Sequence, residues 1–184
     1  MMRAAVLALG LLLAGCGLRP LYGGGESGAV RQTLSGVEVA PITGQNGWLV
    51  ANALRDRLRQ EGPARYRLEI RLDDDITGLG IRRDDSITRE RRTLRARYQL
   101  VDLADGAVVV DATAGSDAGI DVVQSEYATI AAENTALERL SGIVADEIVA
   151  SIALYAQRRA AAPAVPAAAP TALPATTPAP APVR

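Results

Sequence analysis

The residue best suited to covalent chemistry in this chain is Cys16, its only cysteine, which follows Leu13, Ala14 and Gly15 at the end of an apolar run. A single cysteine cannot form an internal disulfide, and a free thiol in an oxidising compartment is a chemical liability. We therefore expect the sulfur to be modified, and the small residues before it favour attachment of a lipid.

Residues 1–15 have the composition of a secretory signal peptide, with Arg3 as the positive start and an apolar core over 4–14. That core is too short for a bilayer, which takes about 20 residues. The four residues ending at Cys16 resemble the site at which bacterial lipoproteins are acylated, for example with palmitate, and then cleaved before the cysteine. The alternatives are a plain secretory signal with an incidental thiol, or an uncleaved anchor.

Gly17 directly follows the cysteine. By resemblance to enterobacterial lipoproteins, an aspartate here would favour retention in the inner membrane, so its absence favours the outer membrane. Several acyl chains hold a protein on a membrane far more firmly than one. We expect a mature chain that is tethered on the periplasmic side by lipid on Cys16 and has no other cofactor.

Arginine supplies every basic side chain, and its distribution is uneven. The chain has 20 basic and 21 acidic residues, so its overall charge predicts no nucleic-acid partner. Ten arginines lie between Arg65 and Arg97, whereas Val101 to Gln157 holds ten acidic residues against Arg139 alone. The codon bias of a GC-rich genome would explain the absence of lysine, but it does not explain the clustering.

Signatures of catalysis and of metal binding are weak. The chain has no histidine, so histidine-based triads and histidine metal sites are excluded. Asp73-Asp74-Asp75 lacks the spacing of a calcium loop and predicts a solvated turn, and Gly78-Leu79-Gly80 predicts a bend. A hydrolase using carboxylates such as Glu126 or Glu133 is the least favoured class. We expect no enzyme and no bound metal.

Composition divides the chain into four parts. Residues 1–15 form the signal peptide and 16–33 the lipidated N-terminal lead, within which 23–33 predict a flexible stretch that starts with three glycines. Residues 34–158 form one domain, large enough for a single core. Residues 159–184 are almost all alanine and proline and predict a disordered tail.

Hydrophobic spacing within the domain predicts strand, helix, three strands and helix. Asp105-Gly106 is a hairpin signal that joins the third and fourth strands. Residues 86–92 fit either a strand or a loop, and 115–119 a polar connection. The expected elements are a strand at 37–42, a helix from its cap Asn46 to Gly62-Pro63, strands at 65–72, 94–100 and 107–112, and a helix from about Ser125.

This order predicts an α+β fold, because each element has only one apolar side to bury. We expect a two-layer sandwich in which a four-stranded, mainly antiparallel sheet is covered on one face by two helices. The other face of the sheet would then lie open.

Arginines alternate with the apolar residues of two predicted strands and would project together from the open face. They are Arg65, Arg67, Arg71, Arg95 and Arg97. The segment that fits strand or loop adds Arg89, Arg91 and Arg92. Like charges on neighbouring strands destabilise each other, and guanidinium groups bind phosphate and carboxylate in bidentate fashion. This pattern predicts an anionic partner. The alternative is that the arginines are solvated and pair with aspartates nearby, namely Asp73, Asp74, Asp75, Asp84 and Asp85.

The start of the mature chain, Cys16-Gly17-Leu18-Arg19-Pro20-Leu21-Tyr22 followed by glycines, together with this element order, resembles the LptE family of alphaproteobacterial type. The resemblance covers residues 1 to about 158, and Leu18 stands where these proteins often have phenylalanine. It implies an outer-membrane lipoprotein that acts as plug and scaffold of the LptD β-barrel. Together the two proteins place lipopolysaccharide (LPS) in the outer leaflet.

Because lipid A carries phosphates, the strand pattern makes Arg71, Arg92, Arg95 and Arg97 the candidate LPS contacts; they are not transferred from known family sites. The alternative function is an auxiliary lipoprotein of an ABC-type lipid or solute transport system, which has a similar small α+β design. The partner would distinguish the two functions.

Overall fold

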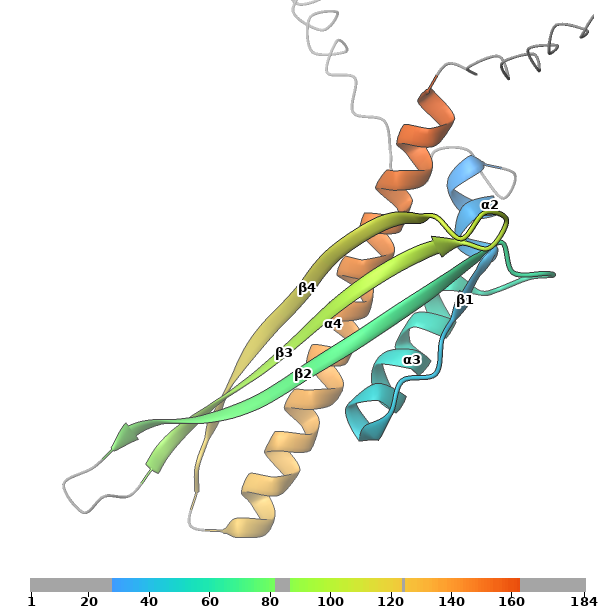
Figure 1. Ribbon diagram of the computed structural model, residues 1–184. Coiled ribbons are helices and arrows are strands. Elements are labelled where there is room, and N and C mark those ends of the chain that lie inside the picture. The colour runs from blue at the N-terminus through green and yellow to red at the C-terminus, as the bar shows by residue number, and fades with distance from the viewer. Residues whose placement is uncertain (1–27, 82–86, 124, 163–184) are drawn as a thin grey trace, which may run out of the picture.

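Three long strands, one short strand and three helices make up the part of the chain that the structure describes (Figure 1). The structure is a computed structural model that describes residues 28–81, 87–123 and 125–162; the predicted signal peptide, Cys16 and most of the predicted tail lie outside these ranges. The elements are α2 (Ala29–Ser35), β1 (Val37–Val39), α3 (Gly44–Leu58), β2 (Tyr66–Ile81), β3 (Ile87–Asp102), β4 (Val108–Asp121) and α4 (Glu126–Ala161).

The strands form one sheet in the order β1-β2-β3-β4. β1 runs parallel to β2, and the other two pairings are antiparallel, so the predicted α+β class with a mainly antiparallel sheet is confirmed. The predicted hairpin is also present: Gly106 has φ of 74°, and the Asp105 carboxylate accepts a hydrogen bond from the Ala107 N–H at 2.9 Å. A positive φ favours glycine at such a turn.

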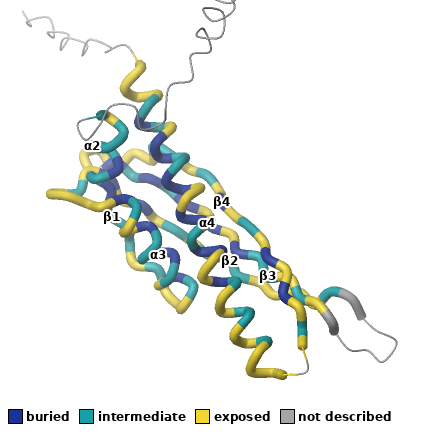
Figure 2. Tube along the Cα trace, turned by 180° about the vertical axis from the view of Figure 1, so that it is seen from behind, coloured by how far each residue is buried: buried dark blue, intermediate teal, exposed yellow. Residues whose placement is uncertain are grey.

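α3 and α4 cover the same face of the sheet, as the two views from opposite sides show (Figures 1 and 2). The core lies between the two layers, where Leu68, Leu94 and Leu100 of the strands lie with Leu54 of α3 and Ile148 of α4, all fully buried. Within the described chain, the opposite face of the sheet carries no helix. The predicted two-layer arrangement is therefore present.

α4 is the longest element and starts where the sequence predicts. The Ser125 hydroxyl accepts a hydrogen bond from the Ala128 N–H at 3.4 Å. By length and composition alone the helix could cross a membrane, but half of its most apolar stretch is buried inside the domain. Its apolar stripe from Leu137 to Ile152 packs in the core. In this fold α4 forms part of the helical layer that covers the sheet.

α3 differs from the prediction at both ends. The predicted cap, Asn46, lies inside the helix, and its side chain accepts a hydrogen bond from the next amide, that of Gly47, at 2.7 Å. At the other end Arg59 adopts a left-handed conformation (φ 47°) and ends the helix before the predicted stop at Gly62-Pro63. The Arg59 N–H still bonds to the Arg55 carbonyl at 3.0 Å, which closes the last turn without a glycine.

The three long strands extend well past their predicted ends. The predicted turn at Asp73–Asp75 and the bend at 78–80 are wrong, because both segments lie within β2. Residues 115–119 likewise belong to β4, and β3 already begins at Ile87. Continuous antiparallel pairing with β3 supplies the backbone hydrogen bonds here and outweighs the low strand propensity of aspartate and glycine.

The predicted flexible stretch over 23–33 is wrong for its last residues, because α2 starts at Ala29. Val30 and Leu34 explain the difference: both pack against the hydrophobic core, and Leu34 is buried. Burial of these side chains stabilises a helix too short to persist alone. The folded part thus begins before the predicted boundary at Leu34, and α4 continues to Ala161, beyond the predicted end at Arg158.

Candidate functional site

The uncovered face of the sheet carries most of the candidate arginines. Arg71 of β2 and Arg95 and Arg97 of β3 are exposed, while alternate residues of the same strands, such as Leu94 and Tyr98, are buried under the helices. Side chains alternate between the two faces of a strand. The pairing of β2 with β3 sets Arg71 directly opposite Arg97, so the structure brings three of the four candidates together.

Acidic residues of β4 neutralise part of this face. Asp111 pairs with Arg97 at 3.1 Å, and Asp121 pairs with Arg89 at 3.1 Å. The hydrogen bond from Gln99, followed by that from Arg97, lowers the pKa of Asp111. These pairs are exposed, so each adds little to stability. Their main effect is to lower the charge along the β3–β4 side of the face.

The row of β4 aspartates that pair with arginines of β3 is interrupted at Gly115, which lies opposite Arg95. A Cβ atom at Gly115 would lie only 3.1 Å from Arg95 Cγ and 3.1 Å from the Leu94 carbonyl oxygen. Glycine therefore leaves room for the aliphatic part of Arg95 and offers it no carboxylate. Among the described residues, neither Arg95 nor Arg71 makes an ion pair, and the same is true of Arg67 on β2.

A cavity of about 760 Å³ opens on this face where β1 ends. Three guanidinium groups line it, those of Arg67, Arg71 and Arg97, together with the carboxylates of Glu38 and Glu69. The rest of its wall is formed by Gln99, Ala40, Pro41 and Ile70. Arginine exceeds acid in the lining, and a concave, partly apolar site with a few charged groups suits a ligand that carries both anionic and apolar parts.

Arg92 does not belong to this site. Its side chain lies on the helix-covered face, where Nε and Nη2 donate to the two carboxylate oxygens of Asp74 at 2.8 and 2.6 Å. Nη1 donates to the Glu133 carbonyl of α4 at 3.0 Å, and hydrogen bonding to Asp74 raises the pKa of Arg92. The two side chains are only 12% and 14% exposed. Of the four candidate arginines, Arg92 therefore lies on a different surface from the other three.

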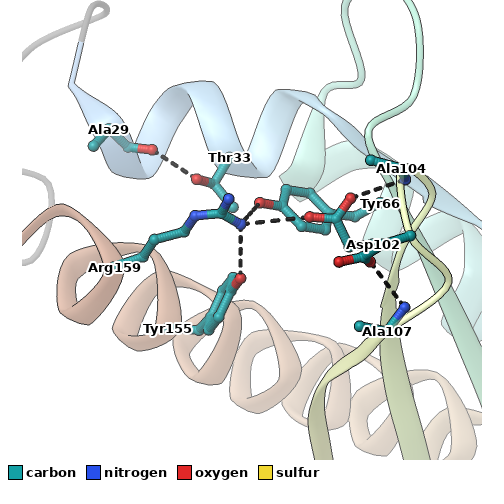
Figure 3. Close-up of polar contacts among 9 residues, drawn as sticks. Ala29, Thr33, Tyr66, Asp102, Ala104, Ala107, Tyr155 and Arg159 are labelled. Atoms are coloured by element: carbon teal, nitrogen blue, oxygen red, sulfur yellow. Dashed lines mark hydrogen bonds and ion pairs between the residues drawn. The ribbon is translucent and has the colours of Figure 1, made fainter. Parts of the chain in front are cut away.

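A polar cluster that the sequence reasoning missed lies at the end of α4 (Figure 3). Arg159 Nη1 donates to the hydroxyl oxygens of Tyr66 and Tyr155 at 2.6 and 3.0 Å, and lies 3.5 Å from the buried Asp102 carboxylate. The Ala104 N–H and the Arg159 guanidinium hold the pKa of Asp102 below its usual range. The feature of the sequence that could have indicated this cluster is Asp102, a carboxylate on the apolar side of the alternation in β3. The cluster fastens α4 to the sheet.

The structure gives no support for a metal centre in the described residues, where no group of three or more metal-ligating side chains occurs. The three consecutive aspartates are separated by the strand: Asp74 points to the helix side, whereas Asp73 and Asp75 are exposed. Cys16, the predicted lipid site, lies outside the described residues.

Comparison with solved structures identifies several lipoproteins of similar fold. A candidate lipoprotein from Caulobacter crescentus is 25% identical, with a TM-score of 0.61, and the match covers 72% of this chain and 98% of that one. Rare lipoprotein B from Shewanella oneidensis is 12% identical (TM-score 0.54; 67% and 96% covered), and lipoprotein B from Nitrosomonas europaea is also 12% identical (TM-score 0.52; 66% and 82% covered). At such identity the last two show the fold alone.

The family comparison is more specific. No curated protein matched the chain. The model of a lipopolysaccharide-assembly family, however, matches residues 34–152, which span the structure from the end of α2 to the last turns of α4. The chain therefore belongs to the LptE family of lipopolysaccharide-assembly proteins.

Proposed function

We propose that this protein is a non-enzymatic lipoprotein, held on the periplasmic side of the outer membrane by lipid on Cys16, that acts as plug and scaffold of the LptD β-barrel. Membership of the LptE family supports the role in LPS assembly. The signal sequence that ends at Cys16 supports the anchor, because its apolar core is too short to span a bilayer.

The surface of the domain suits the interior of a large barrel. Such interiors are polar and filled with water. The open sheet face presents charged side chains of both signs, with arginines on β2 and β3 and aspartates on β4. A plug with this surface can form hydrogen bonds with the barrel wall and needs no apolar contact to stay there.

We also propose that Arg71, Arg95 and Arg97 contact the phosphates of LPS. The observation that carries this proposal is that Arg71 and Arg95 make no ion pair among the described residues, while Arg71 and Arg97 line the cavity at the end of β1. Arg97 shares the surface but already pairs with Asp111. Arg92 is not included, because Asp74 and Glu133 occupy its donors.

The partner is tested by isolating the acylated protein from its own membrane in mild detergent. We expect an outer-membrane β-barrel to co-purify in constant ratio, and we expect Cys16→Ser to lose the anchor. Recovery with an inner-membrane or periplasmic transport complex would contradict the proposal and favour the ABC-type alternative.

The LPS contact is tested with the double variant Arg71→Glu and Arg95→Glu. Loss of two charge-assisted contacts predicts at least about tenfold weaker LPS binding. The difference from wild type should shrink at high salt, which screens exposed charges. The matched control is Arg89→Glu and Arg91→Glu, which makes the same change in charge where β4 aspartates already pair with both arginines. Equal binding by a folded test variant, or equal loss in the control, would contradict a specific site.

A further inference from the structure

β2 has an edge that no strand of the described chain occupies. β1 pairs with β2 only between Tyr66 and Leu68, and β1 ends at Val39. β2 continues to Ile81 and runs far beyond β1 in Figure 1. From Ile70 onward, its side facing away from β3 is therefore open in the described structure.

The direction of the backbone groups at this edge follows from one hydrogen bond. The Leu68 carbonyl accepts from the Ala40 N–H at 3.0 Å, so the backbone of Leu68 points toward β1. Backbone groups of successive residues alternate between the two edges of a strand. The N–H and C=O groups of Ile70, Leu72, Asp74 and Ile76 must then point out of the open edge, and no described residue supplies them with a backbone partner.

The side chains along this edge have two distinct faces. On the helix side, Ile70 and Leu72 are only half-buried, and Ile76 is 40% exposed. On the open face Arg71 and Asp73 are exposed, and the sign of charge changes between them. An exposed, regular edge with apolar side chains is a site for pairing with another chain.

We propose that the β2 edge from Ile70 to Thr77 accepts an extended segment of a partner polypeptide by strand addition. The partner segment alternates apolar residues, which cover Ile70, Leu72 and Ile76, with charged ones. Opposite Arg71 it carries an acidic residue, and opposite Asp73 and Asp75 it carries basic residues, because charges directly opposite each other on neighbouring strands interact most strongly. In strand addition, main-chain hydrogen bonds provide the affinity and these alternate side chains provide the specificity.

The same charges argue against a second copy of this chain as the occupant. Antiparallel pairing of two β2 edges about Leu72 would set Glu69 against Asp75, which offsets the attraction of Arg71 for Asp73. Pairing about Asp73 would set Arg71 against Asp75 but Asp73 against its own copy, so each of these registers keeps a like-charge pair. The register that sets Arg67 against Asp73 is attractive, but β1 already occupies the edge at Arg67. A different polypeptide can place an opposite charge against each charged residue of the edge.

Ile76 allows the edge to be tested without disturbing the sheet. Its N–H points away from β3, so Ile76→Pro removes an outward donor and leaves the β2–β3 hydrogen bonds intact, as proline at edge strands does. Ile76→Ala is the matched control, because it truncates the same side chain and keeps the N–H. Neither change touches the arginines proposed to contact LPS, so this test is independent of that one.

The probe is a synthetic seven-residue peptide in which four valines alternate with lysine, lysine and glutamate, in that order, for antiparallel pairing with Asp75, Asp73 and Arg71. Binding is measured by fluorescence anisotropy with the full acylated chain in detergent, and amide hydrogen exchange maps the contact. We expect slower exchange at the amides of Ile70, Leu72 and Ile76, and Ile76→Pro to bind at least about fivefold more weakly than Ile76→Ala.

Three results would overturn the proposal. The first is that Ile76→Pro and Ile76→Ala bind the peptide with equal affinity. The second is that the wild-type protein binds a peptide with exchanged charges as tightly as the original peptide. The third is a dimer of the protein alone in sedimentation that Ile76→Pro abolishes, since the edge would then belong to a second copy.

Discussion

At the scale of single residues, each arginine's role is set by the side of the strand on which it stands. Arg91 and Arg92 are adjacent in sequence, yet Arg91 is exposed beside Asp117 at 3.9 Å, and Arg92 is nearly buried with Asp74. A buried ion pair gains Coulomb energy but costs desolvation, so removal of one partner is far more damaging than replacement of both. The two neighbours should therefore respond differently to the same mutation.

We predict that Arg92→Ala lowers the free energy of unfolding by about 3 kcal/mol or more, because Asp74 is left buried without a counter-charge. Arg91→Ala should cost less than about 1 kcal/mol, since its pair is exposed. Urea unfolding followed by circular dichroism measures both. The double variant Arg92→Leu with Asp74→Leu should regain much of the loss, and similar costs for Arg91→Ala and Arg92→Ala would refute the assignment.

The position of Arg92 could have been predicted from the sequence. Counted back from Tyr98, Ala96 and Leu94, it falls on the apolar side of the alternation. The aspartates that pair with Arg89, Arg91 and Arg97 could not be assigned, because the register of β4 depends on an irregularity between Leu100 and Val101. That shift has no clear sequence signal.

At the scale of elements, the sequence reasoning succeeded where apolar spacing is regular and failed where tertiary pairing decides. Strand alternation over 65–72 and 94–100 and the helical stripe of α4 were visible, as was the hairpin at Asp105-Gly106. The continuation of β2 through Asp73–Asp75 and the short α2 were not, because each depends on contacts with a neighbouring element. The cavity at the end of β1 was missed for a similar reason, because its position depends on the residue at which β1 ends.

α3 and α4 are joined by an ion pair whose response to acid can be predicted. Arg57 of α3 donates to both carboxylate oxygens of Asp146 of α4, and this hydrogen bonding lowers the pKa of Asp146 below its usual 3.8. As pH falls, the unfolded chain takes up this proton before the folded one does. The stabilisation is therefore complete above about pH 5 and is lost as pH drops through the unfolded pKa and then the folded pKa.

We predict a smaller loss of stability between pH 5 and pH 2.5 in Asp146→Asn than in wild type. Urea unfolding across this range is the measurement. Asp102 and Asp111, whose pKa values are also lowered, remain in both proteins and account for the residual loss. An identical acid dependence in the variant would contradict the role of the Arg57–Asp146 pair.

At the scale of the whole molecule, the two ends of the described chain emerge at the same end of the domain. α2, which follows the lead from Cys16, packs against α4, whose last residues lie beside it in Figure 1. The Arg159 cluster fastens the same turn of α4 to the sheet. The helix contacts that hold this end are therefore complete before Ala162.

We predict that removal of residues 163–184 leaves the free energy of unfolding unchanged within about 0.5 kcal/mol. Truncation after Ala156, which also removes Arg159, should lower it clearly, because Asp102 then loses its cationic partner. Urea unfolding of both truncations, in a Cys16→Ser background without lipid, measures the difference. A large loss on removing the tail alone would contradict the assignment of the tail as a separate segment.

The shared exit of both chain ends also has a mechanical consequence. If the membrane pulls on the lipid while another component of the envelope pulls on the tail, the load passes across the α2–α4 contact and the Arg159 cluster. Apart from the ends of β2 and β3 that the Arg159 cluster contacts, the sheet lies outside that path. Tension along the tether would therefore strain the helical end first and leave the spacing of the arginines on the open face unchanged.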